Sequence, residues 1–417
     1  MTLILKGNII SAEKYGELNI VENGYLVSNN GIIEGVFKTL PQEYQNNKIV
    51  DYGDKLIMQS FSDMHLHAPQ YPMLGMGMDL PLLDWLNTYT FPVEANFKNT
   101  DFARKIYHEL ALKLIKNGTT RVAMFSSLHK EATLILMDEL ERAGICGYVG
   151  KVNMDRNGGI DLQEETQESI DETIDWLKKS NFKHIKPIIT PRFTPSCTNE
   201  LMEALGKIIK EYNLPIQSHL SENTSEVSWV KELHPDCPEY FDTYVKYGMW
   251  NNKTLMAHCV HSSPRELKSM KDNGVYVVHC AASNQNLMSG YAQIKKMVDD
   301  GINVVLGSDI AGGDYLSMFD NVAATIRASK ARNILDNWET GFLTVSQAYY
   351  LGTSAANKFF DEKPGFAKGN KLHCLILDDS KLVSARKLTI KERFERSIYN
   401  RQDDAIISVY SEGRKVL

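Results

Sequence analysis

Short apolar runs rich in β-branched residues alternate with longer amphipathic stretches through the middle of the chain. The runs predict strands at residues 56–61, 120–125, 147–152, 184–190, 215–219, 254–258, 275–279 and 303–307. The stretches between them place apolar residues at helical spacing and predict helices, for example at residues 102–116, 130–143, 168–178, 199–211, 225–232 and 264–271. Strands and helices alternating in this way predict an α/β fold, a (β/α)8 barrel.

Both ends of the chain depart from this alternation. Residues 1–54 contain short strand-like runs separated by Gly, Asn and Glu turn signals, and strand-like runs return at residues 374–377 and 405–410. Chain termini often lie close together in space. We therefore expect a small β-domain made of residues 1–54 and 370–417, flanking a barrel of residues 55–369.

Composition and charge exclude several classes of protein. A hydrophobic content of 43% and a charged content of 24% are typical of soluble globular chains. The net charge of -6 provides no basic surface for nucleic acid. No apolar run approaches a membrane span, and the first residues are too short a run for a signal peptide. The six cysteines form no C-x-x-C pair, as expected for reduced thiols in a cytoplasmic protein.

His65 and His67 end the apolar segment 55–67 and form an H-x-H pair. A spacing of two residues on a strand puts both imidazoles on the same face. Neutral imidazoles suit zinc or iron and do not suit magnesium or calcium. The same pair is also compatible with two unrelated polar residues at a strand end, so the other strand ends decide between these readings.

Side chains able to bind a metal recur at the ends of later predicted strands. His219, His258 and His279 end three of them, and Asp309 follows the last. The carboxyl ends of barrel strands form one rim, where the active site lies. Taken singly, each has an ordinary explanation as a core histidine or a turn aspartate. Their common position predicts one metal site, with the ligands His65, His67, His219 and Asp309.

Five more residues near these strand ends offer groups for proton transfer and recognition. His258 is placed to hydrogen-bond the water on the metal. Glu222 is placed to move a proton, although a glutamate there is also common at an exposed helix start. Arg192 offers directional donors to a carbonyl or an anion, or else forms a surface ion pair. Gln70 offers one donor and one acceptor face, and Phe193 can stack on a planar ring.

Longer motifs surround these residues. They read H-L-H-A-P-Q-Y at 65–71, D-L-P-L-L-D-W-L at 79–86 and Y-T-F-P at 89–92, with further segments at 190–193, 217–223, 256–258 and 307–313. Together they resemble the guanine deaminases of the metal-dependent amidohydrolase superfamily, over the whole expected barrel and more loosely over the ends. One departure is visible: residues 281–282 are Ala-Ala, where that family usually has Pro-Asn.

The resemblance implies a function and a role for each candidate residue. The function is the hydrolytic deamination of guanine to xanthine and ammonia, with one Zn²⁺ per chain (Fe²⁺ being the alternative metal), a homodimeric state and a lid at residues 75–97. The implied zinc ligands are His65, His67, His219 and Asp309. The implied catalytic groups are Glu222 as proton shuttle, Asp309 and His258. The implied guanine contacts are Gln70, Arg192 and Phe193.

Two alternatives remain open. The first is a related aminohydrolase that acts on a pterin, an oxidised guanine or a triazine, because pocket specificity is poorly read from sequence. The second is a non-catalytic scaffold on the same fold. Such a scaffold would be expected to lose ligands, and this chain keeps all four together with Glu222.

Overall fold

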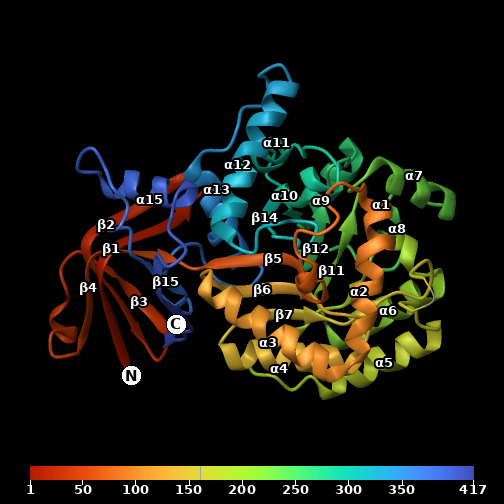
Figure 1. The fold of residues 1–417 in the computed structure, drawn as a ribbon, viewed down its shortest axis with the longest axis horizontal. Coiled ribbons are helices and arrows are strands. Elements are labelled where there is room, and N and C mark those ends of the chain that lie inside the picture. The colour runs from red at the N-terminus through yellow and green to blue at the C-terminus, as the bar shows by residue number, and fades with distance from the viewer. Residues whose placement is uncertain (160) are drawn as a thin grey trace.

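The computed structural model describes residues 1–159 and 161–417, and both chain ends meet in one seven-stranded sheet. Its strand order is β17-β16-β15-β4-β1-β2-β3. This sheet lies to one side of the molecule, at the left of Figure 1. The strands are β1 (Thr2–Lys14), β2 (Glu17–Asn29), β3 (Ile32–Phe37), β4 (Ile49–Gln59), β15 (Cys374–Leu377), β16 (Ile406–Ser411) and β17 (Arg414–Lys415).

The middle of the chain forms parallel strands in two main sheets, with the orders β5-β6-β7-β9 and β11-β12-β13-β14. Their bounds are β5 (Phe61–His67), β6 (Thr119–Phe125), β7 (Cys146–Gly150), β9 (Ile185–Pro187), β11 (Ile216–Leu220), β12 (Thr254–His258), β13 (Tyr276–His279) and β14 (Asn303–Leu306). A further short parallel pair joins β8 (Val152–Asn153) and β10 (Thr190–Pro191).

Backbone hydrogen bonds link the two main sheets at both edges. The Asp309 amide donates to the carbonyl of His65 at 2.8 Å, and the Ile189 amide donates to the carbonyl of Pro215 at 2.9 Å. The resulting arrangement is TIM-barrel-like, with parallel strands surrounded by helices (Figure 1).

Helices follow the strands and cover their outer face. The longer ones are α3 (Thr100–Lys116), α4 (Lys130–Ala143), α5 (Thr166–Lys179), α6 (Asn199–Tyr212), α7 (Thr224–Leu233), α9 (Pro264–Asn273), α12 (Met318–Leu335), α13 (Val345–Gly352) and α15 (Ile390–Tyr399). Shorter ones are α1 (Leu82–Trp85), α2 (Phe91–Ala95), α8 (Asp242–Val245), α10 (Ala281–Asn286), α11 (Ile294–Asp299) and α14 (Ser354–Asn357). Within the described ranges, no helix has the length and apolarity needed to cross a bilayer.

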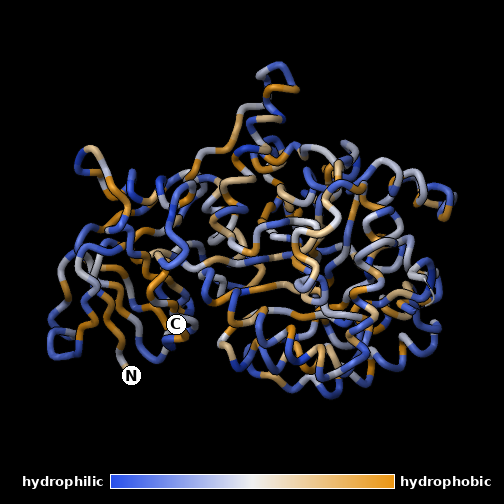
Figure 2. The backbone as a smooth tube through the Cα atoms, viewed as in Figure 1, coloured by the Kyte–Doolittle hydropathy of each residue, from blue (hydrophilic) through white to orange (hydrophobic). Residues whose placement is uncertain are grey.

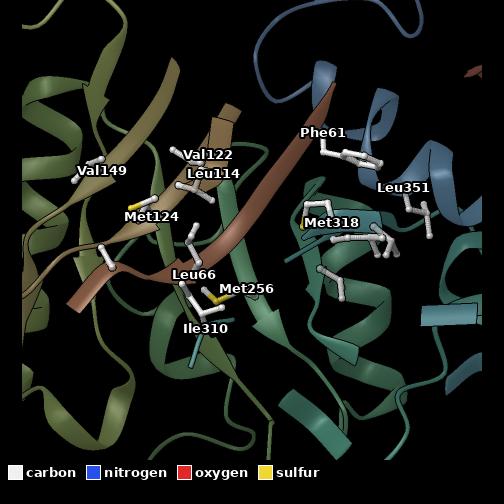
Figure 3. Close-up of a cluster of buried hydrophobic side chains, with 14 of the residues drawn as sticks. Phe61, Leu66, Leu114, Val122, Met124, Val149, Met256, Ile310, Met318 and Leu351 are labelled. Atoms are coloured by element: carbon white, nitrogen blue, oxygen red, sulfur yellow. The ribbon is translucent and has the colours of Figure 1, made fainter. Parts of the chain in front are cut away.

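Alternation along the strands separates two apolar layers. In β12, Leu255 and Ala257 pack in one buried cluster while Met256 packs in another, as the two-residue period of a strand requires. The larger cluster joins the strands to the helices; Figure 3 shows Leu66 and Met124 within it. Figure 2 shows that apolar residues are concentrated in the inner strands and polar residues in the outer turns.

The start of the barrel differs from the sequence prediction. Residues 56–59 belong to β4, which pairs with β1 and β15 in the terminal sheet, and the barrel strand is β5, from Phe61 to His67. Only Ser60 separates β4 from β5, so the sequence pattern does not mark where one strand ends and the next begins. The terminal strands β1 and β2 are also longer than the short runs predicted there.

Gly307 lets β5 and the segment after β14 approach closely. A Cβ at this position would lie 2.7 Å from the Cβ of His65 and 2.9 Å from its carbonyl oxygen. We expect Gly307→Ala to lower the free energy of unfolding by about 1–3 kcal/mol, because backbone must move to admit the methyl group. Urea denaturation measures this change.

Gly352→Ala is the matched control. That glycine is also buried, but its Cβ would meet only side-chain atoms, the nearest at 3.3 Å on Val322. Equal stability of the two variants would contradict the close-approach argument.

Candidate metal and catalytic site

Four side chains converge where β5, β11 and β14 end: His65, His67 and Asp309 are buried and His219 is half-buried. The Nε2 atoms of His67 and His219 are 3.1 Å apart. Oδ1 of Asp309 lies 3.2 Å from Nε2 of His65 and 3.5 Å from Nε2 of His67. The two-residue spacing in β5 places His65 and His67 on the same side of that strand. His219, in β11, and Asp309, after β14, lie at the same rim.

The three short distances of 3.1, 3.2 and 3.5 Å among these atoms are close to those expected between ligands of one cation. Bonds of about 2.0–2.1 Å place ligand atoms roughly 3.3 Å apart. Nε2 of His65 is buried and has no hydrogen-bond partner among the described residues, although the Asp309 carboxylate is close to it. Burial lowers the pKa of all three imidazoles, so each is neutral and can offer a nitrogen lone pair to a metal. Three imidazoles and one carboxylate suit zinc or iron.

Two neighbouring groups prepare the ligands for a metal. Nδ1 of His219 donates to the carbonyl oxygen of Arg192 at 2.6 Å, which leaves its Nε2 lone pair directed at the cluster. Burial would raise the pKa of the Asp309 carboxyl, but the close contact with the His65 imidazole outweighs burial and holds that pKa well below its usual range. Asp309 therefore stays ionised.

Glu222 and His258 form an acid–base pair beside the ligands. Nε2 of His258 lies 3.5 Å from Glu222 Oε2 and 3.7 Å from Asp309 Oδ2. Burial raises the pKa of the Glu222 carboxyl to about 7. Burial would lower the pKa of His258, but the charges of Glu222 and Asp309 outweigh it and raise that pKa. Each group therefore favours the protonated form more than it would in water, which suits proton transfer beside the ligands.

Residues that the sequence analysis did not single out hold this pair in place. Nδ1 of His258 pairs with Oδ1 of Asn284 at 2.8 Å, so its Nε2 is directed at Glu222. The Ser289 hydroxyl donates to Glu222 Oε1 at 3.1 Å, and Glu226 accepts from the Glu222 amide at 2.9 Å. No local sequence pattern marks these residues, because each acts across elements or through a capping contact.

The predicted substrate contacts line one pocket with the ligands. Its walls include Gln70, Arg192 and Phe193 together with Glu222 and His258. Leu82, Trp85 and Leu86 close it from the segment expected to be a lid. The structure thus brings together all nine predicted site residues; His65 lies directly behind the pocket wall, in the ligand cluster.

Arg192 and Gln70 share a buried partner that was not expected. Glu94, from α2, accepts from Arg192 Nη1 at 2.6 Å and from Arg192 Nη2 at 3.0 Å. It also accepts from Gln70 Nε2 at 2.9 Å. The segment around Glu94 was recognisable in sequence, but nothing in its pattern marked this one carboxylate as buried.

The departure at residues 281–282 leaves the site intact. Ala281 begins α10, and both alanines pack against Ala324 and Ala328 of α12. The same short helix carries Asn284 to His258. His279, at the end of β13, stays outside the ligand cluster.

Comparison with known proteins agrees with this geometry. Residues 56–416 match the model of the amidohydrolase family. The guanine deaminase of Dictyostelium discoideum is 34% identical over 440 residues, which covers 99% of this chain and 98% of that protein. The mouse guanine deaminase is 35% identical, covering 87% of this chain and 83% of its own.

Among solved structures, guanine deaminase from C. acetobutylicum with bound guanine in the active site is 43% identical, with a TM-score of 0.97 and full coverage of both chains. The E. coli guanine deaminase is 25% identical with a TM-score of 0.90, covering 100% of this chain and 99% of that one. The chain therefore belongs to the amidohydrolase family, among the guanine deaminases.

Proposed function

We propose that the chain hydrolyses guanine to xanthine and ammonia with one zinc ion per chain. The observation that carries this proposal is one pocket lined by three candidate metal ligands, a buried carboxylate and a guanidinium, with the fourth ligand, His65, directly behind its wall. Its full-length likeness to guanine deaminases supports the choice of substrate.

The ligands of the zinc ion would be His65, His67, His219 and Asp309. When bound, zinc would lower the pKa of a coordinated water to about 7 and so supply a nucleophile at neutral pH. Iron(II) satisfies the same donor set.

Glu222 would carry the protons of the reaction. Its carboxylate would accept a proton from the attacking water and pass it to the ring nitrogen beside the carbon that bears the amino group. The hydroxyl group now on that carbon would then lose its proton as it becomes a carbonyl, and Glu222 would pass this proton to the amine, which leaves as ammonia as the C–N bond breaks. His258, held by Asn284, would keep the water oriented toward that carbon.

Arg192, Gln70 and Phe193 would hold the purine ring. A guanidinium has donors only, so Arg192 pairs with the carbonyl oxygen of guanine and opposes the amino group that adenine has at the same position. Phe193 forms an apolar wall for the flat ring.

The architecture that would carry this site is a (β/α)8 barrel of residues 55–369, flanked by a small β-domain of residues 1–54 and 370–417. Strand β4 crosses the proposed boundary and ties the two parts together. We also propose a homodimer and a cytoplasmic location; the six unpaired cysteines support the location.

A substrate panel tests the proposed function directly. We expect the zinc-loaded protein to release ammonia from guanine and to leave adenine essentially untouched. The panel should include a pterin, 8-oxoguanine and an amino-triazine. Faster turnover of any of these three than of guanine would overturn the substrate assignment.

His219→Ala tests the metal site. Because the substitution removes one of four ligands, we expect bound zinc and activity to be lost together. Elemental analysis of the purified protein measures the zinc. His279→Ala is the matched control, since it removes a buried histidine from a neighbouring strand end outside the cluster. Full zinc occupancy in His219→Ala would refute the ligand assignment.

Glu222→Gln separates proton transfer from metal binding. The shape is kept and the basic oxygen is lost, so zinc content should stay normal while kcat falls by roughly 10²–10⁴-fold. The wild-type kcat/KM should decline as the pH falls below about 7, because a protonated Glu222 accepts no proton. The residual activity of Glu222→Gln should not show this decline at low pH. A pH profile like that of the wild type would contradict the role of Glu222 in proton transfer.

Arg192→Met tests recognition of the carbonyl oxygen. The apolar stem is largely kept and every donor is removed, so guanine should lose about 1.5–3 kcal/mol of transition-state binding, the value of a charged hydrogen bond. Zinc should be retained, because Arg192 is not a ligand. Wild-type kcat/KM for guanine in this variant would show that Arg192 does not read the carbonyl.

A further inference from the structure

Glu94 lies behind the pocket and contacts both side chains that would read the purine. Its two carboxylate oxygens accept from both terminal nitrogens of Arg192, and one of them also accepts from the Gln70 amide. All three side chains are buried. Glu94 itself does not line the pocket. It therefore acts on a ligand only through its partners.

The contacts of Gln70 leave its amide one orientation. A carboxylate only accepts hydrogen bonds, so the side of Gln70 that faces Glu94 must be its NH2 group. The other side receives the Ala311 amide at 2.9 Å and must be its oxygen. One N–H and one lone pair remain for a ligand, in an order that the protein determines.

The contacts of Arg192 fix its plane and neutralise its charge. The bidentate pair with Glu94 holds the guanidinium flat, and its carbon lies 5.2 Å from the centre of the Phe91 ring. Three of its five N–H groups stay unused by Glu94. Without the carboxylate, a buried cation would be left uncompensated close to the metal ligands.

We propose that Glu94 is the positioning residue that sets the preference of this pocket for a purine with a 6-carbonyl group. The proposal rests on the proposed function, since it assumes that Arg192 and Gln70 contact the base. Glu94 comes from α2, within the segment that covers the pocket, so this specificity depends on the cover as well as on the barrel strands.

Glu94→Gln is the central variant. An amide at this position brings a donor group against the donors of Arg192 and Gln70, so the network cannot form as it does with the carboxylate. Equilibrium dialysis or calorimetry with hypoxanthine, which has the 6-carbonyl, and with unsubstituted purine, which lacks it, measures recognition without turnover. We expect hypoxanthine to bind about tenfold or more weakly, and purine to change little.

Three further variants distinguish positioning from a purely structural role. Glu94→Asp keeps the charge and should recover part of the preference for hypoxanthine. In an Arg192→Met background, Glu94→Gln should cost little further affinity, because the group it orients is gone. Glu362→Gln breaks another, partly buried Arg–Glu pair, with Arg121 in β6, and should leave both affinities unchanged.

The outcomes are decisive in either direction. A loss of affinity confined to hypoxanthine, with normal zinc content by elemental analysis, supports the proposal. Equal losses for both ligands, additive losses in the double variant, or no preference for hypoxanthine in the wild type overturn it. Absence of ammonia release from guanine by the wild type would instead refute the proposed function, and the binding measurements would still decide the role of Glu94.

Discussion

The site depends on holding four electron-rich ligand atoms close together at the strand ends. Imidazole nitrogens and a carboxylate oxygen 3.1–3.5 Å apart are unfavourable neighbours unless a cation or a proton lies between them. The rest of the structure must therefore hold the strand ends close together. It must also hold two residues in the left-handed backbone region, Asp309 with φ 47° and His258 with φ 73°, which adds to the cost. The surrounding core, the strand pairing and the close approach at Gly307 all hold this arrangement together.

Much of this could be predicted because strands carry a local pattern. The ligands stand at the ends of apolar runs, and parallel strands bring such ends to one edge, so His65 and Asp309 were found without a structure. The pattern fails at residues 56–61, which contain no glycine or proline and were predicted as one strand, because β4 and β5 divide this segment between two sheets. The helix α12 was not predicted because it is buried on most of its faces and so shows little amphipathic pattern. The helix α15 is amphipathic and begins with a capping box, but it lies in the segment expected to be β-structure.

Supporting residues were harder to predict than ligands for a physical reason. Asn284 and Ser289 contact the acid–base pair through single hydrogen bonds across elements, whereas Glu226 does so through a helix-capping contact, and all three residue types are common at helix starts and turns. Glu94 lies in a five-residue helix whose burial depends entirely on tertiary packing. Such groups decide which tautomer, amide orientation or protonation state the pocket presents. Sequence reasoning thus identifies the reactive atoms before it identifies what orients them.

The terminal sheet imposes an order on how the chain is completed during synthesis. Strand β4 pairs on one side with β1, which is made before it, and on the other with β15, which is made after every barrel strand. Until residues 374–377 leave the ribosome, that edge of β4 remains unpaired, although β5 follows it directly in the chain. An open strand edge is a site for unwanted pairing with other chains. We expect nascent chains that stall before β15 to aggregate through this edge even when their barrel strands are already made.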